Sequence, residues 1–98
     1  MYNKGGILLN NKNIMGMELP KYKCVKEVWA LKIKNIVGLP DGGATITPEE
    51  GGYEPFDVSR EYMEKHNPTV GGYFVVYKDG YKSFSPAEAF EDGYVLLN

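Results

Sequence analysis

The sequence has few of the residues that build catalytic or metal-stabilised small proteins. Its 98 residues include one cysteine, Cys24, and one histidine, His66. A single cysteine excludes a disulfide within the chain and a zinc site built from several thiolates. The paired glycines lack the spacing and the strand-to-helix setting of a phosphate-binding loop. No metal motif is present, and the sequence predicts no cofactor.

Nucleophilic catalysis has little support in the sequence. A thiol or hydroxyl nucleophile needs a base within hydrogen-bonding reach. Cys24 and His66 are the only thiol and imidazole, and they fall on separate predicted elements. We interpret Cys24 as a buried or half-buried strand residue, and His66 as a helix C-terminal residue that interacts with the dipole. The sequence therefore predicts a protein that is not an enzyme.

Long apolar segments are missing as well. The run Ile7–Leu9 is followed by four polar residues and is too short for the apolar region of a signal peptide. No other run approaches the length needed to cross a bilayer. We therefore expect a cytoplasmic protein without a membrane partner.

Basic residues do not exceed acidic ones, and they are unevenly placed. The formal net charge is −2, which argues against sequence-independent binding to long nucleic acid. Residues 1–40 carry seven lysines and two glutamates, a balance of +5, whereas residues 41–98 carry four basic and eleven acidic residues, a balance of −7. This asymmetry indicates an anion-binding strip or complementary faces in a self-association, unless the lysines only form a solvated strand edge.

The chain is rich in aromatic residues, with eight tyrosines. Asp79-Gly80 lies between two runs of valine, tyrosine and phenylalanine, and this dipeptide is typical of a two-residue type I′ hairpin turn. We predict the two strands to be Tyr73–Lys78 and Tyr81–Phe84, with Val75 opposite Phe84. Both faces would carry large apolar side chains, so each face needs a cover.

A short helix should follow this hairpin directly. Ser85-Pro86-Ala87-Glu88 has the form of a capping box with proline at the first helical position. Gly93 is predicted to end the helix in the left-handed conformation. Tyr94–Leu97 can then return as a final strand.

The middle of the chain supplies the other predicted elements. Alternation of apolar and lysine residues favours a strand over Lys21–Ile36, although a helix fits part of this segment. Shorter strands are expected at Ala44–Thr47 and Phe56–Val58, and Ser59 should cap a helix over Arg60–His66. The order β-β-β-α-β-β-α-β predicts an α+β fold, a small curled antiparallel sheet or partly open barrel with two short helices.

The N-terminal residues differ from the rest in composition. Asparagine, glycine and lysine dominate residues 1–20, and no period is visible. We therefore predict a flexible N-terminal extension over residues 1–20 and a single α+β domain over residues 21–98. A sheet with open edges and aromatic faces would be closed naturally by homo-oligomerisation.

Several segments resemble small proteins encoded by tailed phages, most of which have no assigned activity. The segments are KYKCVKEVWALKI (21–33), GYEPFDVS, KHNP and GGYFVVYKDGYKSFSPAEAFEDGY (71–94). The resemblance covers about residues 21–95. Members of the group often have histidine after the cysteine, where this chain has Val25, so a role for that histidine does not transfer.

Phages encode many proteins of this size that counter host immunity, and this chain looks like one class of them, the anti-CBASS sponges. A sponge sequesters a cyclic nucleotide signal in the host-cell cytoplasm without cleaving it. The resemblance implies a homo-oligomer that binds a cyclic nucleotide or another small anionic ligand. The residues expected to line the site are Lys23, Lys26, Trp29, Tyr81, Lys82, Ser83 and Ser85. The alternative is an accessory protein that binds a host or virion protein through its aromatic surface.

Overall fold

A computed structural model describes residues 13–97 of the chain. Its elements are β1 (Asn13–Ile14), β2 (Met17–Glu18), β3 (Trp29–Gly38), β4 (Ala44–Pro48), β5 (Phe56–Val58), α1 (Arg60–His66), β6 (Tyr73–Val76), β7 (Lys82–Ser85) and α2 (Ala87–Gly93). Strands β1 and β2 form a small hairpin, and the others form one antiparallel sheet in the order β5-β4-β3-β6-β7. The predicted α+β class, a curled antiparallel sheet with two short helices, is confirmed.

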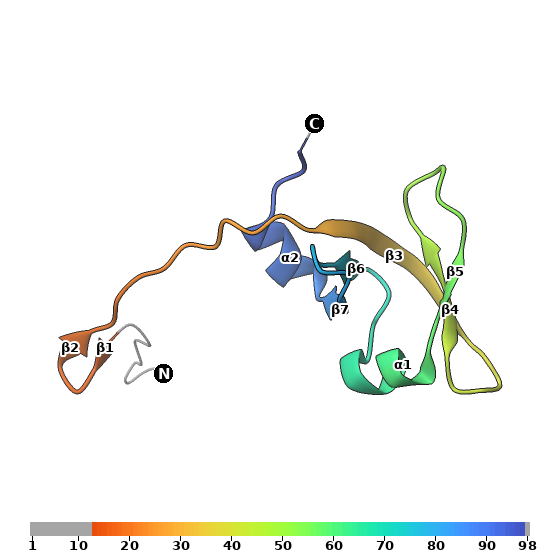
Figure 1. Cartoon of the computed structure of the whole chain (residues 1–98), viewed down its shortest axis with the longest axis horizontal. Helices are drawn as coiled ribbons and strands as arrows, with labels where there is room; N and C mark the ends of the chain where they lie inside the picture. The colour runs from red at the N-terminus through yellow and green to blue at the C-terminus, as the bar shows by residue number, and fades with distance from the viewer. Residues whose placement is uncertain (1–12, 98) are drawn as a thin grey trace.

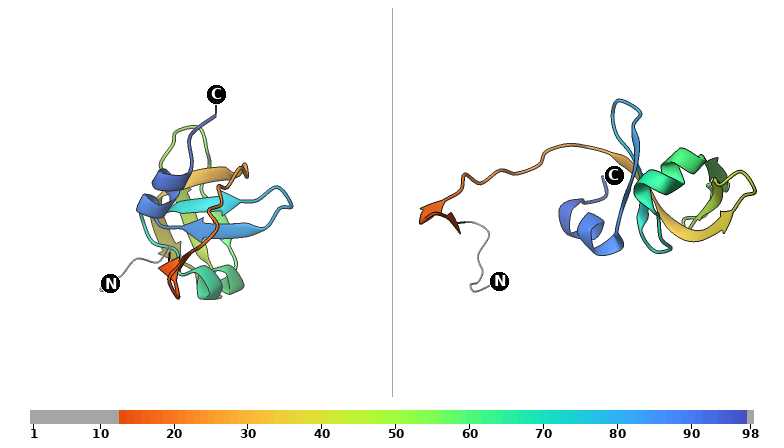
Figure 2. Two further views of the ribbon diagram at one scale, coloured as in Figure 1. Left: turned by 90° about the vertical axis from the view of Figure 1, so that its left-hand side faces the viewer. Right: turned by 90° about the horizontal axis from the view of Figure 1, so that it is seen from below.

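Strand β3 is the long central strand, and the sheet curls around it into a half-barrel (Figures 1 and 2). Residues 29–32 of this strand pair with β6, whereas residues 33–38 pair with β4. The register shifts between Ile33 and Asn35, and such a bulge bends a strand and increases its twist. The barrel has two edge strands, β5 and β7, which are not paired with each other.

The hydrophobic core lies between the sheet and α1. Ile33 and Ile46 are fully buried, and Tyr62 from α1 joins them. The Phe74 ring lies 4.7 Å from that of Phe56 and 5.7 Å from that of Tyr62, centroid to centroid. The Tyr62 hydroxyl also donates a hydrogen bond of 2.7 Å to the Ser83 carbonyl, so one side chain ties α1 to both the core and β7.

Helix α2 contacts the opposite face of β6. Adjacent strand residues point to opposite faces, so Tyr73 faces away from the core that Phe74 enters. The Tyr73 ring stacks on Phe90 of α2 with centroids 4.1 Å apart, and Phe90 stacks on Tyr94 at 4.5 Å. The two faces of the hairpin are therefore covered by different helices, as the apolar content of both faces required.

The β6–β7 hairpin differs from the prediction by one residue. The Tyr77 amide donates to the Tyr81 carbonyl at 2.9 Å, and the Gly80 amide donates to the Tyr77 carbonyl at 2.8 Å. The loop therefore has three residues and ends in Gly80 at φ 90°, the pattern of a type I turn followed by a left-handed residue. Val75 consequently lies opposite Ser83. This register places Phe84 opposite Phe74, on the core side, so side-chain packing overrides the signal of the Asp-Gly pair.

Helix α2 begins one residue later than predicted, and its capping box does not form. Pro86 is the N-cap and makes no side-chain capping bond. The Ser85 hydroxyl is then one position too early to cap the helix, and it donates to the Pro86 carbonyl at 3.3 Å. Gly93 is part of the helix and has no positive φ, whereas the C-cap Tyr94 is extended at φ −130°. The predicted left-handed stop at Gly93 is wrong.

Two predicted strand segments have no ladder partner among the described residues. Residues 21–28 of the predicted Lys21–Ile36 strand are outside any strand, since the pairing of β3 with β6 ends at Trp29 and Val76. Residues 94–97 are also outside any strand. By contrast, Phe56–Val58 and Arg60–His66 have the predicted bounds, and Ser59 caps α1.

The predicted boundary at residue 20 is not tested by this structure. Most of the predicted extension, residues 1–12, lies outside the described residues. Residues 13–18 of the extension form the β1–β2 hairpin, whose turn residues Met15 and Gly16 both have positive φ. The division into residues 1–20 and 21–98 therefore remains a prediction.

Candidate interaction surface

The end of the β6–β7 hairpin presents a pair of stacked tyrosines. Tyr77 and Tyr81 flank the three-residue loop, and their ring centroids are 5.7 Å apart at an interplanar angle of 23°. The Asp79 carboxylate accepts a hydrogen bond from the Tyr81 amide at 3.0 Å, and Gly80 supplies the positive φ. The loop thus holds both rings on a hydrogen-bonded turn.

Two lysines from different parts of the chain lie over these rings. The Lys26 Nζ, from the segment before β3, is 4.2 Å from the Tyr77 centroid, and the Lys65 Nζ, from α1, is 5.0 Å from the Tyr81 centroid. The His66 ring lies 6.0 Å from Tyr81 in an edge-on arrangement. Exposed cation–π contacts of this kind contribute about 0.5–1 kcal/mol each. We refer to Lys26, Lys65, His66, Tyr77 and Tyr81 as the tyrosine–lysine cluster.

Trp29 is a further exposed aromatic residue at this end of the sheet. It opens β3 opposite Val76, the residue before Tyr77. Its relative exposure is 63%, although tryptophan is more often buried. Exposed tryptophan and tyrosine are the residue types that most often dominate binding energy at protein interfaces.

The seven residues predicted to line a ligand site are spread over several places. Trp29 and Lys82 both lie opposite Val76, from its two neighbouring strands. Lys26 and Tyr81 are connected through the ring of Tyr77. These two pairs are the parts of the predicted set that the fold brings together.

The other predicted residues have separate positions. Ser83 offers its carbonyl to Tyr62, and the hydroxyl of Ser85 is bonded to the Pro86 carbonyl. Lys23 is exposed on the segment before β3. Of the seven, Lys82 alone lines a cleft of about 210 Å³ between β5 and α1, and Lys26 alone lines a second of about 300 Å³ at the hairpin loop.

Three members of the tyrosine–lysine cluster were not among the predicted residues. Tyr77 was missed as a partner of Tyr81 because the predicted two-residue turn places Tyr77 opposite Lys82, whereas the three-residue loop of the structure places it opposite Tyr81. Lys65 and His66 were missed because their approach to Tyr81 depends on how α1 packs beside β7. The spacing of Tyr62 and His66 on one helix face was the available sequence signal, since their rings lie 4.7 Å apart.

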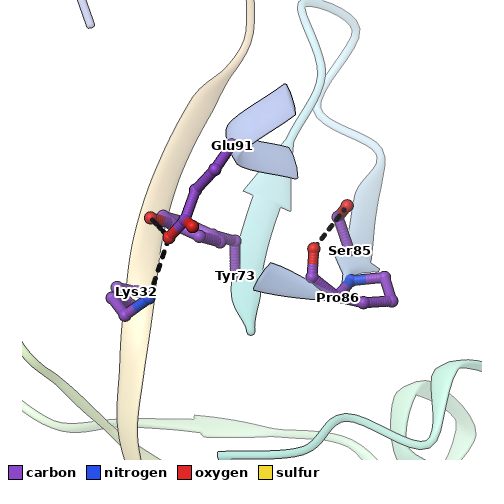
Figure 3. Close-up of polar contacts among 5 residues, drawn as sticks. All are labelled: Lys32, Tyr73, Ser85, Pro86 and Glu91. Atoms are coloured by element: carbon purple, nitrogen blue, oxygen red, sulfur yellow. Dashed lines mark hydrogen bonds and ion pairs between the residues drawn. The ribbon is translucent and has the colours of Figure 1, made fainter. Parts of the chain in front are cut away.

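A second polar group joins α2 to the sheet (Figure 3). Glu91 accepts hydrogen bonds through Oε2 from the Lys32 Nζ at 3.0 Å and from the Tyr73 hydroxyl at 2.8 Å. The bond from Lys32, followed by that from Tyr73, lowers the pKa of Glu91. The bond to Glu91 raises the pKa of Lys32 and also that of Tyr73. Because all three side chains are paired with each other, we interpret this group as the attachment of α2.

Residues 13–97 contain no group of three or more His, Cys, Asp and Glu side chains that could hold a metal ion. Cys24 is exposed, contrary to the prediction of a buried or half-buried residue. His66 contacts Tyr62 and Tyr81. No helix of the described chain is long and apolar enough to span a membrane.

The fold is similar to that of a phage protein. One similar solved structure is the monomeric form of the phage L decoration protein in solution, which is 32% identical to this chain, with a TM-score of 0.58. The match covers 74% of this chain and 55% of the decoration protein, so this chain spans about half the length of that protein. No protein-family model matches the chain, and no curated protein matches it.

This similarity supports the expected resemblance to small phage proteins, since the similar structure is that of a phage protein. The similar protein is a decoration protein. The comparisons contain nothing that supports a cyclic-nucleotide sponge. They fit the alternative, an accessory protein that binds a virion protein, better than they fit nucleotide sequestration.

Proposed function

We propose that this protein is a phage accessory protein that binds the outer surface of a capsid by contacting the coat protein. The observation that carries the proposal is the 32% identity with a decoration protein, together with a TM-score of 0.58. The exposed aromatic residues support the same function, because a binding protein of this size needs apolar anchors on its surface.

The tyrosine–lysine cluster and Trp29 are the proposed contact surface. Trp29 and Tyr81 provide aromatic area, and both keep at least 40% of their surface exposed in the free chain. Lys26 and Lys65 would meet carboxylates on the coat protein, and their positions over tyrosine rings restrict them before binding. The proposed partner surface is therefore acidic with apolar pockets.

Replacing the aromatic anchors tests this proposal. We expect Trp29→Ala and Tyr81→Ala each to weaken binding to capsids at least about tenfold, because loss of a central anchor costs about 2 kcal/mol or more. Binding would be measured by co-sedimentation with purified capsids that lack the protein. Tyr53→Ala is the matched control, since Tyr53 is 59% exposed but lies on the loop before β5.

The outcomes separate the function from the surface. Wild-type protein that never co-sediments with capsids would overturn the proposed function. If the wild-type protein binds capsids and both alanine variants bind equally well, the proposed function stands and the proposed contact surface is wrong. Paired reversal, Lys26→Glu with Lys65→Glu, should also weaken binding, and more strongly at low salt than at high salt, because exposed charges are screened by ions.

Nucleotide sequestration has weaker support and remains the second prediction. The cation–π pairs at Tyr77 and Tyr81 would suit a base and its phosphate, but neither cleft gathers more than one of the predicted residues. Native mass spectrometry with cyclic di- and trinucleotides tests it directly. A stoichiometric complex that releases unmodified nucleotide would support it, and absence of any complex would reject it.

A further inference from the structure

Within the described residues no strand joins the edge strands β5 and β7 of the half-barrel, and we call this side, where α1 packs against β7, the seam. A cleft of about 210 Å³ between β5 and α1 lies there, with Phe56, Tyr62 and Phe74 in its apolar part and Asp57, Ser59 and Lys82 as polar residues. The described sheet ends at β5 and at β7, so neither strand has a second neighbour within it. An edge strand beside an apolar cleft is a template for a further strand.

The same chain carries an extended segment that has no strand partner among residues 13–97. We call residues 19–28 the arm, and Figures 1 and 2 show it running away from the sheet. Tyr22 is 90% exposed on it and Val25 is 87% exposed. The Cα radius of gyration is 17.4 Å, whereas about 13 Å is expected for a compact chain of this length. Within residues 13–97 the arm therefore exposes apolar side chains and takes part in no strand pairing.

We propose that the arm of one copy adds as a strand along the seam of a second copy and closes its barrel. Four arm residues reach about 13 Å when extended, which matches the three residues of β5 and the four of β7. The arm contacts its own hairpin through Lys26, whose Nζ lies over the Tyr77 ring, and the rest of it runs away from its own sheet (Figure 1). A second copy is therefore the occupant that the geometry favours.

Charge supports the pairing of these two segments. The arm holds three lysines and one glutamate. Residues 49–57, which form the loop after β4 and the first two residues of β5, hold four acidic residues and no basic one. The two segments therefore carry net charges of opposite sign. Since each copy has one arm and one seam, two copies can exchange arms about a two-fold axis.

Side-chain alternation gives the arm a defined orientation. Phe56 and Val58 face inward on β5, and Asp57 between them is exposed. A strand with Tyr22 directed into the cleft places Lys21 and Lys23 on the outer face, the face of Asp57. Opposite charges on neighbouring strands of one face stabilise their pairing.

A charge exchange in the full-length protein tests this interaction. We expect Lys21→Glu with Lys23→Glu to raise the dimer dissociation constant at least about tenfold, and Asp57→Lys to raise it similarly. Combining all three substitutions should restore dimerisation to within about threefold of wild type. The control Lys34→Glu with Lys78→Glu changes the net charge equally at exposed positions outside the arm and seam. Sedimentation velocity without capsids gives the dissociation constants.

The single cysteine allows a second, independent measurement. Native chains would be mixed with Cys24→Ser/Lys82→Cys chains and treated with a short bis-maleimide, and mixed pairs would be identified by intact mass. We expect efficient cross-links between Cys24 of the native chain and the introduced cysteine at position 82 in the seam of the other copy. The control mixture replaces the second chain with Cys24→Ser/Lys34→Cys and should give few cross-links. A protein that stays monomeric near millimolar concentration, or charge variants that dimerise like wild type, would overturn the proposal. The test uses neither capsids nor the tyrosine–lysine cluster, so it can fail while the proposed function holds.

Discussion

Ser59 fixes the start of α1 through a hydrogen bond that Ser85, before α2, does not make. The Ser59 hydroxyl accepts from the Tyr62 amide at 3.0 Å, and Tyr62 is the buried core residue of that helix. Ser85 instead donates to the carbonyl of the next residue at 3.3 Å. Two serines in similar sequence settings thus have different effects on the helices that follow them.

This difference predicts unequal effects of two equivalent substitutions. We expect Ser59→Ala to lower the free energy of unfolding by about 1 kcal/mol, the usual cost of losing an N-cap. Ser85→Ala should change it by less than about 0.5 kcal/mol, since no capping bond is lost. Urea unfolding followed by far-UV circular dichroism measures both. An equal loss in the two variants would mean that α2 is capped by Ser85 after all.

The Lys32–Tyr73–Glu91 group makes the attachment of α2 dependent on pH. The pKa of Glu91 lies below its usual 4.5, so its contribution to stability is present above that value and is lost as the pH falls through the lowered pKa. The pKa values of Lys32 and Tyr73 lie above the usual 10.5 and 10.0, so their contributions are present below those values and are lost as the pH rises through the raised ones.

We therefore expect α2 to stay docked from about pH 5 to pH 10 and to loosen on both sides of this range. The measurement is a pH titration of the α2 amide chemical shifts by NMR. Glu91→Gln should abolish the acid transition, and Glu88→Gln, an exposed residue of the same helix, should retain it. An acid transition that persists unchanged in Glu91→Gln would contradict this role of Glu91.

Local sequence patterns were sufficient for some elements and insufficient for others. Phe56–Val58 and Arg60–His66 were predictable because alternation, a cap residue and a following Asn-Pro all agree. The hairpin register was not, because Asp79-Gly80 suits both a two-residue and a three-residue loop. The choice is made by Phe84, which reaches the core opposite Phe74 only in the longer loop. That contact is tertiary and invisible in the local sequence.

The candidate surface was predictable in part for the same reason. Lys26, Trp29 and Tyr81 were recognised by residue type, but Tyr77 and Lys65 join them only through the hairpin register and the packing of α1. Residue types alone did not distinguish an anionic ligand from a protein partner, because lysines and tyrosines suit both. The comparison with a decoration protein, rather than the pattern, favours the protein partner.

For the molecule as a whole, the arm and the sheet should respond differently to proteolysis. In dilute solution we expect trypsin to cleave first after Lys21, Lys23 and Lys26, which are exposed and outside any strand. Cleavage after Lys32 and Lys34 in β3 should be much slower, because the strand must open first. Mass spectrometry identifies the order of the cuts, and circular dichroism shows whether the trimmed protein keeps its sheet.

The result also tests where the folded domain begins. A stable fragment that starts near Glu27 would place the boundary after the predicted residue 20. Early cleavage within β3, or loss of the sheet signal after trimming, would instead show that the arm is part of the folded unit.

The placement of Trp29 has a practical consequence for optical experiments. It is the sole tryptophan, and it lies on the surface and not in the core. Its fluorescence in the free protein should already resemble that of a solvated indole, so unfolding changes it little. Covering Trp29 with a partner should shift the emission to shorter wavelength. The chain thus contains an intrinsic optical probe that is nearly silent to folding and responsive to docking.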